Sequence, residues 1–328
     1  TTNLPDDHLH LFADSGAKAV IVSTPALAER VMAAAVRSRA TKLVIAIEPR
    51  RLAQQSDVTS ISWEQVLAEG RARGDGRPPE AVTRAARTDV ACIIYTSGTG
   101  GVPKGVMLSH GAILCNCMGA FDLLYELGLG EEIFLSFLPL SHSYEHSAGQ
   151  FFPISIGAQI YYAESMEALS RNMMEARPTI MTAVPRLYEV PHHRILHGIK
   201  RASPRRQKLF WKTVELGRRR YENPGCLSLG DRIADAVLDR LVRRQVRRRF
   251  GGRIKALVSG GAPLNVEIGA FFTALGLRLL QGYGQTEAAP IVSCNRPSRI
   301  KLHTVGPPMR GVEVRIAEDG EILVRGEL

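Results

Sequence analysis

Short segments rich in β-branched residues alternate with longer amphipathic segments along most of this sequence. The short segments predict β-strands over residues 18–23, 42–48, 89–96, 132–138, 158–164, 179–184 and 255–260. Apolar residues at three- and four-residue intervals predict helices over residues 25–37, 63–71, 110–127, 166–176, 205–221, 229–250 and 265–275. Thr24-Pro25 and Ser109 are the expected helix starts. Because strands that alternate with helices form βα units, we expect an α/β fold of stacked, mainly parallel sheets flanked by helices.

The length and the punctuation of the chain predict more than one lobe. A chain of 328 residues is expected to form two or three lobes rather than one core. Residues 71–89 contain Gly and Pro without apolar periodicity, which indicates a surface connection. Two alternating strands around Glu318-Asp319-Gly320 predict a β-hairpin. We expect a first α/β subdomain over 1–88, a second over 89–300 and the start of a small β-barrel lobe over 301–328.

The composition argues against secreted and membrane-spanning classes of protein. Hydrophobic residues make up 45% of the chain and charged residues 23%, which is ordinary for a globular protein. No apolar stretch approaches the roughly 18–20 residues needed to span a bilayer, and the N-terminus lacks a signal pattern. Five cysteines, an odd number, indicate reduced thiols and a cytoplasmic location. Cys115 and Cys117 lack a second Cys/His pair at metal spacing, so a packing role is expected.

The segment "YTSGTGGVPKG" at residues 95–105 follows an apolar run and has the composition of an anion-binding loop. Glycines let successive backbone amides point one way and form a nest for an anion. Hydroxyls and a lysine add donors suited to phosphate. The loop residues concerned are Thr96, Ser97, Gly98, Thr99, Gly100, Gly101 and Lys104. The spacing does not fit a Walker A loop, because Pro103 precedes the lysine and Gly105 follows it. A mobile surface turn is the alternative interpretation.

Two later segments suit a flat ring and a charged group. Small residues at the end of a predicted strand let a ring lie against bare backbone, and these are Gly260, Gly261, Ala262 and Pro263. In "LLQGYGQTEAAP" at 279–290, Tyr283 offers a face for stacking and Glu287 a carboxylate. A carboxylate facing phosphates requires a cation between them, and Mg²⁺ meets that need. An ordinary turn and an exposed glutamate are the alternative interpretations.

A fourth segment, "FLPLSHSYEHSAGQF" at 137–151, clusters His142, Tyr144, Glu145 and His146 at the start of a helix. Two histidines and a glutamate are also found in zinc metalloproteases. Those enzymes need the order H-E-x-x-H, which is absent here because Glu145 directly precedes His146. A zinc site is therefore not expected.

These segments together resemble the motifs of the adenylate-forming superfamily, which includes acyl-CoA synthetases, luciferases and peptide-synthetase adenylation domains. "YTSGTGGVPKGVMLSH" is similar to its Y-T-S-G-T-T-G-x-P-K-G-V-x-x-S-H signature and departs from it at Gly100, where a second threonine is usual. The resemblance implies that Lys104, Glu287 and His142 take part in catalysis, and that Glu287 and Thr99 bind the metal. It also implies ATP or AMP binding by the 96–101 loop, by Lys104, by residues 260–263 and by Gln281, Gly282, Tyr283, Gly284, Gln285 and Thr286.

The strings "LPLSHSYEH" and "VPRLYE" resemble the long-chain fatty acid–CoA ligase branch of this superfamily. That resemblance implies an AMP-forming ligase whose substrates are a fatty acid, ATP and coenzyme A, with Mg²⁺ bound. Two alternatives stay open: a fatty acyl-AMP ligase that loads a carrier protein, and a non-catalytic lipid- or membrane-binding module. The family's ribose-binding Asp and C-terminal domain with its adenylation Lys find no match, so a truncated core of low activity is expected. The acyl chain length is not fixed by the sequence.

One segment holds the whole basic excess of the chain. Residues 191–253 contain 18 Lys/Arg and 5 Asp/Glu, whereas the chain as a whole has a net charge of +10. A solvated helical face, attraction to an anionic membrane at the inner face and attraction to substrate phosphates are the interpretations that stay open. No nucleic-acid partner is expected, since no motif that reads DNA or RNA accompanies the charge. The oligomeric state is not fixed, and a homodimer is one alternative.

Overall fold

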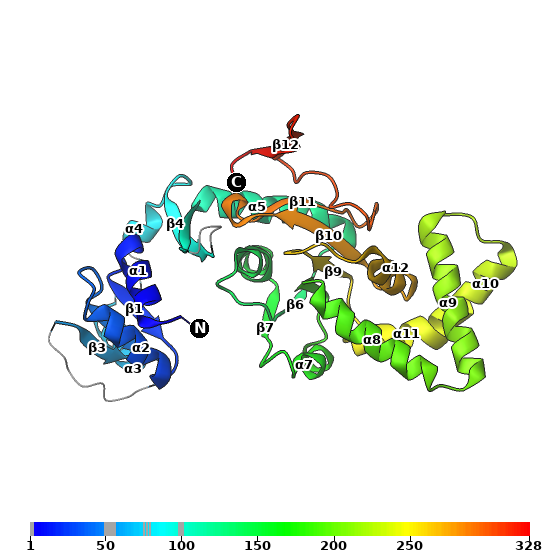
Figure 1. Ribbon diagram of the computed structural model, residues 1–328, viewed down its shortest axis with the longest axis horizontal. Coiled ribbons are helices and arrows are strands. Elements are labelled where there is room, and N and C mark those ends of the chain that lie inside the picture. Colours follow the sequence, from blue (N-terminus) through cyan, green and yellow to red (C-terminus); the bar gives the residue numbers. More distant parts are fainter. Residues whose placement is uncertain (1–2, 49–56, 75, 77, 79, 98–101) are drawn as a thin grey trace. The chain divides into compact units, whose positions relative to one another are not determined.

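The computed structural model describes residues 3–48, 57–74, 76, 78, 80–97 and 102–328 (Figure 1). The chain divides into two compact units. The first comprises residues 1–86 and 95–107, and the second comprises residues 87–94 and 108–328. The subdomain boundaries expected from the sequence stay predictions.

The first unit is built on a parallel sheet of three strands in the order β1–β2–β3. The strands are β1 (Ala19–Val22), β2 (Leu43–Ala46) and β3 (Thr59–Ser62). The helices are α1 (Pro5–Ser15), α2 (Pro25–Ala35), α3 (Trp63–Arg73) and α4 (Glu80–Thr83). The expected start of α2 is confirmed, because the Thr24 hydroxyl accepts a hydrogen bond from the Leu27 amide and Pro25 occupies the first turn.

The second unit contains a sheet of six strands in the order β11–β10–β9–β8–β6–β7. The strands are β6 (Ile133–Ser136), β7 (Gln159–Tyr162), β8 (Ile180–Ala183), β9 (Ala256–Ser259), β10 (Leu279–Gly284) and β11 (Ile291–Cys294). Every neighbouring pair is parallel except β10 and β11. The five parallel strands therefore present their carboxyl ends at one edge of the sheet.

Helices pack against both faces of this sheet, so successive side chains of a strand enter two different cores. One core joins the helices α5 (His110–Leu124) and α6 (Phe152–Ser155) to the strand residues Phe134, Ile180, Ala256 and Leu280. The other joins α7 (Leu169–Ala176), α8 (Arg186–Lys200), α9 (Pro204–Glu222) and α12 (Val266–Ala274) to Leu135, Met181, Leu257 and Leu279. Both faces being covered explains why these strands read as continuous apolar runs in the sequence.

The helices α8 and α9, followed by α10 (Leu229–Leu238), the π-helical turn η3 (Asp239–Arg243) and α11 (Arg244–Arg249), form a helical lobe (Figure 1). The Arg243 side chain is fully buried within it. Its guanidinium donates to a carboxylate oxygen of Asp235 (2.6 Å) and to the backbone carbonyls of Thr213 (3.1 Å) and Ala274 (2.7 Å). One side chain thus joins α9, α10 and α12.

The contact between α9 and α12 depends on a glycine. A Cβ atom added to Gly217 would lie 2.4 Å from the carbonyl oxygen and 2.6 Å from the Cα of Ala274. Real Cβ atoms do not approach backbone that closely. The two helix backbones can therefore touch only because position 217 has no side chain.

The expected α/β architecture is confirmed, and every predicted strand and helix has a counterpart. Four strands and four α-helices were not predicted: β3, β5, β10, β11, α1, α4, α6 and α8. The helix expected over 229–250 is interrupted by η3.

The expected C-terminal hairpin is formed by β12 (Glu313–Ile316) and β13 (Ile322–Arg325), which pair antiparallel. Within the described part of the chain, these two strands close no barrel. No helix of the described residues is long and apolar enough to cross a membrane.

Candidate nucleotide site

The carboxyl edge of the six-stranded sheet gathers three of the four segments singled out from the sequence. The strands β6, β9 and β10 end at Ser136, Ser259 and Gly284. The 137–151, 260–263 and 282–287 segments follow or form these ends. Open α/β sheets bind ligands at this edge, because loops from several strands meet there.

These segments surround a cavity of about 180 Å³. The predicted residues that line it are His142, Gly260, Gly261, Gly282, Tyr283, Gly284, Gln285 and Thr286. Lining residues that the sequence did not single out as site residues are Ser143, Tyr144, Val258, Ser259, Pro290, Ile291 and Cys294. Glycines, the two tyrosine rings and a few polar side chains make a small cavity suited to a flat ligand with hydrogen-bonding groups.

Tyr144 lines this cavity and packs against the end of β9. Its hydroxyl donates a hydrogen bond to the carbonyl oxygen of Val258 (2.7 Å). Its ring lies so close to Gly260 that an added Cβ would be 3.1 Å from the ring. A side chain at position 260 would require the Tyr144 ring to shift by a few tenths of an ångström, so glycine leaves the ring its present position at this strand end.

Glu145 follows Tyr144 and is fully buried at the start of the π-helix η2 (Glu145–Phe151). Its carboxylate accepts hydrogen bonds from the hydroxyls of Ser136 and Thr182, at 2.5 Å each. Burial raises the pKa of the Glu145 carboxyl, although both hydroxyls act in the opposite direction. An added Cβ at Gly149 would lie 2.5 Å from the carboxylate carbon, so Gly149 makes the space that Glu145 occupies. The carboxylate joins η2 to β6 and β8 and holds Tyr144 in place.

Side-chain hydrogen bonds hold the 282–291 segment, one within the segment and others to Ser143 and to α5. The Gln285 side-chain amide donates to the Tyr283 hydroxyl (2.7 Å), and the hydroxyls of Thr286 and Ser143 lie 3.0 Å apart. The Asn116 amide group of α5 donates to the carbonyl of Ala288 (3.1 Å) and accepts from the amide of Ile291 (2.8 Å). The side chains of Tyr283 and Thr286 are thereby fixed at the cavity.

Four predicted residues of these segments do not line the cavity. Ala262 and Pro263 are exposed, and the 3₁₀ turn η4 (Thr286–Ala288) presents Glu287 to solvent. Gln281 is buried within β10, and its amide oxygen has no hydrogen-bond partner among the described residues. Gln281 is thus buried inside the sheet, whereas Gly282 to Thr286 on the same segment line the cavity.

The described residues contain no group of three or more His, Cys, Asp or Glu side chains that could hold a metal ion. Glu287 is one exposed carboxylate next to Thr286, which lines the cavity. Mg²⁺ is commonly held by one or two carboxylates together with substrate phosphates. One carboxylate therefore fits a Mg²⁺ ion that arrives with a nucleotide.

The glycine-rich loop connects β4 (Val90–Thr96) to β5 (Lys104–Ser109), which form a two-stranded sheet. Thr96 ends β4, Ser97 follows it, and Lys104 begins β5 with its side chain exposed. These three residues belong to the first unit. The predicted phosphate ligands Gly98, Thr99, Gly100 and Gly101 lie outside the described residues.

The strand that leads into this loop is held within the first unit by a side chain that the sequence did not single out. The Tyr95 hydroxyl donates a hydrogen bond to the Asp14 carboxylate (2.6 Å). Burial, together with that hydrogen bond, raises the pKa of Tyr95 to about 12. On the other side of the loop, the His10 ring nitrogen lies 3.1 Å from the Pro103 carbonyl. Both flanks of the loop are thus attached to α1.

Comparison with known proteins identifies relatives over most of the chain. The family described as "AMP-binding enzyme" matches residues 2–328. Long chain acyl-CoA synthetase 6, peroxisomal, of Arabidopsis thaliana is 30% identical over 295 residues, which cover 84% of this chain and 40% of the relative. The long-chain-fatty-acid–CoA ligase FadD15 of Mycobacterium tuberculosis (strain ATCC 25618 / H37Rv) is 33% identical over 255 residues, covering 76% of this chain and 42% of the relative. The chain thus spans less than half the length of these relatives.

Solved structures share the fold at lower identity. A benzoate CoA ligase from Burkholderia xenovorans LB400 is 23% identical with a TM-score of 0.63, over 98% of this chain and 52% of that one. ATP-bound MatB from Rhodopseudomonas palustris is 21% identical with a TM-score of 0.65, over 100% of this chain and 54% of that one. The α/β arrangement is therefore the arrangement of acyl-CoA synthetase-like N-terminal domains.

Proposed function

Because this chain belongs to the AMP-binding enzyme family, we propose that its protein is an ATP-dependent, AMP-forming ligase that converts long-chain fatty acids to acyl-CoA. The cavity at the carboxyl edge of the sheet carries the proposal, because it brings together His142, the glycines after β9 and the segment from Gly282 to Thr286. The names of relatives that are 30–33% identical support a long-chain fatty acid as the substrate.

The proposed reaction has two steps. An oxygen of the fatty carboxylate attacks the α-phosphorus of ATP, the bond to the leaving pyrophosphate breaks, and an acyl-adenylate forms. The thiolate of coenzyme A then attacks the acyl carbon and AMP leaves. The first step is needed because AMP is a far better leaving group than an oxide ion.

The residues that line the cavity have distinct proposed roles. Tyr283 stacks on the adenine, Gly260 and Gly261 let the ring approach the backbone, and Thr286 donates to a phosphate. His142 is exposed at the mouth of the cavity, where the reacting carboxylate would be held. Lys104 and the loop at 97–101 are proposed to stabilise the charge that develops on the leaving pyrophosphate. Mg²⁺ bound by Glu287, with Thr99 as the second proposed ligand, would neutralise phosphate charge.

Calorimetric titration of this chain with ATP and with a non-hydrolysable long-chain acyl-AMP analogue tests the proposal. We expect both to bind, and we expect Glu287→Gln to weaken Mg²⁺-dependent ATP binding while leaving the analogue, which has no triphosphate, nearly unchanged. Glu318→Gln removes an exposed carboxylate from the C-terminal hairpin and serves as the matched control. Failure of both ligands to bind would overturn the assignment of the cavity as a nucleotide site.

The acceptor of the acyl group needs a separate measurement on the whole protein. Release of AMP that depends on coenzyme A would support the ligase. Trapping of an acyl hydroxamate by hydroxylamine, without AMP release on adding coenzyme A, would instead indicate transfer to a carrier protein.

We also propose that the helical lobe contacts an anionic membrane surface at its periphery. Leu229, Ile233, Val237 and Leu241 recur every four residues on α10 and η3, and their exposed fractions are 77%, 69%, 51% and 51%. The exposed side chains of Arg232, Arg240 and Arg244 follow the same stretch. An exposed apolar stripe beside basic side chains is typical of helices that lie in a membrane interface.

Sedimentation with lipid vesicles tests this contact. We expect the chain to sediment with vesicles that contain anionic lipid, and sedimentation to decrease at high salt because the basic residues are screened. Replacing Ile233 and Val237 by Ser should reduce it, whereas replacing the exposed hairpin residues Ile316 and Leu323 by Ser should not. Equal effects of the two double variants would contradict the proposed surface.

A further inference from the structure

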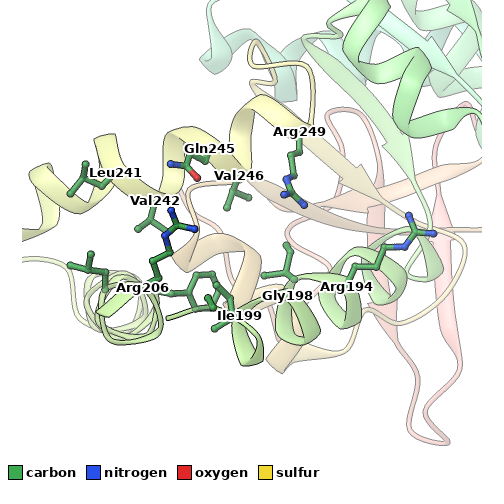
Figure 2. A pocket seen from close by; sticks show the side chains of 13 residues that line it. Arg194, Gly198, Ile199, Arg206, Leu241, Val242, Gln245, Val246 and Arg249 are labelled. Atoms are coloured by element: carbon green, nitrogen blue, oxygen red, sulfur yellow. The ribbon is translucent and has the colours of Figure 1, made fainter. Parts of the chain in front are cut away.

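The helical lobe contains a second cavity, which shares no lining residue with the candidate nucleotide site. It has a volume of about 520 Å³ and lies between α8, α9, η3 and α11 (Figure 2). Cavities of roughly 300–1,000 Å³ are the usual size for small-molecule sites. The cavity is therefore large enough for a ligand of its own.

Most of the side chains that line this cavity are apolar. The apolar side chains come from all four bounding helical segments and are Ile195, Ile199, Leu209, Phe210, Leu241, Val242 and Val246. Leu209 and Leu241 are 43% and 51% exposed, so apolar surface continues to the opening. An alkyl chain placed here would remove its own apolar surface and that of the lining from water.

The polar part of the lining is almost entirely basic. Arg194, Arg206 and Arg249 line the cavity, and no acidic residue does. Figure 2 shows Arg249 extending from α11 and Arg206 from α9 toward the space between these helices. Among the described residues, none of these three arginines forms an ion pair, and all three are exposed.

Other arginines of the same lobe contrast with these three. Arg218, Arg219, Arg220, Arg243 and Arg247 each form an ion pair with a nearby Asp or Glu. The guanidinium groups at the cavity thus keep donors available for an anion, and their planar fork suits carboxylate and phosphate oxygens.

From the apolar lining and the unpaired arginines, we propose that this cavity binds a single-chain amphiphile with an anionic head group. The alkyl chain lies along the apolar side chains, and the head group, a carboxylate or a phosphate, is held by Arg206 and Arg249. The proposal does not depend on the ligase activity, because the cavity is separate from the candidate nucleotide site.

Calorimetric titration of this chain with dodecyl phosphate, below its micelle concentration, tests the proposal. Dodecanoate tests a carboxylate head, inorganic phosphate tests the head alone and dodecanol tests the chain alone. We expect dodecyl phosphate, dodecanoate or both to bind at least about tenfold more tightly than inorganic phosphate and dodecanol. The proposal is wrong if inorganic phosphate or dodecanol binds as tightly as the charged amphiphiles. It is also wrong if neither dodecyl phosphate nor dodecanoate binds as a monomer.

Two variants locate the binding. Arg206→Ala with Arg249→Ala should weaken binding about tenfold, whereas Arg205→Ala with Arg248→Ala removes the same charge from the same helices outside the cavity and should change it little. Gly198→Leu should also weaken binding, because an added Cβ at Gly198 meets no atom within 4 Å and the longer side chain would fill the cavity without straining α8. Binding that survives Gly198→Leu, or that responds equally to the two double variants, would overturn the proposal.

Discussion

The Glu145 carboxylate combines full burial with two hydroxyl donors, and these two influences on its ionisation oppose each other. Burial disfavours the charged form, whereas the hydroxyls of Ser136 and Thr182 stabilise it. Burial is the larger influence, so the pKa of the carboxyl is raised above its ordinary value of 4.5. Between pH 4.5 and the raised pKa, the Glu145 carboxyl is protonated in the folded protein and ionised in the unfolded chain.

This difference predicts a pH dependence of stability. The contribution of Glu145 is complete below pH 4.5 and is lost as the pH rises through the pKa of the folded state. The Glu145→Gln variant has no carboxyl to ionise at this position. Its free energy of unfolding should therefore rise relative to that of the parent chain as the pH increases from 4.5 through the raised pKa. The slope of the difference should not exceed about 1.4 kcal/mol per pH unit. Urea unfolding of both proteins over a pH series measures it, and a difference that is constant with pH would contradict the expectation.

Arg243 gives a second prediction at the scale of one residue. Replacing it by Ala leaves the buried carboxylate of Asp235 with only its half-exposed partner Arg220 and removes donors from two buried carbonyls. We expect a loss of about 3–5 kcal/mol in the free energy of unfolding. Arg244→Ala removes the adjacent exposed arginine and should change stability by no more than about 0.5 kcal/mol. Urea unfolding that shows equal losses would mean that burial of Arg243 contributes little.

Secondary-structure elements were predictable where a single local signal was strong. Long amphipathic helices and apolar strands were predicted because their periodicity is set by which face is buried. The strands β5 and β10 were missed since each contains glycine or follows a loop motif, and glycine weakens a strand signal. The turn η3 was missed because it interrupts a helical pattern without a local signal, at Arg243, whose partners lie on α9, α10 and α12.

The same substitution is expected to have opposite effects on stability at Gly217, where α9 meets α12, and at Gly198 on α8. Gly217→Ala would place a methyl group against the backbone of Ala274, which must move, so we expect a loss of about 1–3 kcal/mol. Gly198→Ala adds a methyl group to α8 with no atom within 4 Å, and should raise stability by up to about 1 kcal/mol. Thermal unfolding of both variants measures the two shifts. A Gly217→Ala variant as stable as the parent would show that the helices separate easily.

At the scale of the whole molecule, the sequence identified most of the segments that form the candidate site, but it did not show how those segments come together. Three quoted segments meet at one cavity because the strands before them are parallel and end at one edge of the sheet. Ile291 and Cys294 also line that cavity, but they lie on the antiparallel strand β11, whose pairing with β10 depends on contacts outside the quoted segments. Sequence spacing alone could not place them. Nor could it show that Gln281, between residues of the same segment, would be buried.

The buried hydrogen bonds of Arg243 determine how the helical lobe opens. Arg243 bonds to α9, α10 and α12, and side chains of α9, α11 and α12 pack in the same core as the central strands, so separation of the lobe breaks contacts with the sheet. Local opening and global unfolding should therefore coincide here. The amides of α9 that face α12 should exchange with deuterium as slowly as those of β8 and β9. In the Arg243→Ala variant, exchange of the α9 amides should become faster than that of the strands, which would make the lobe a separate cooperative unit.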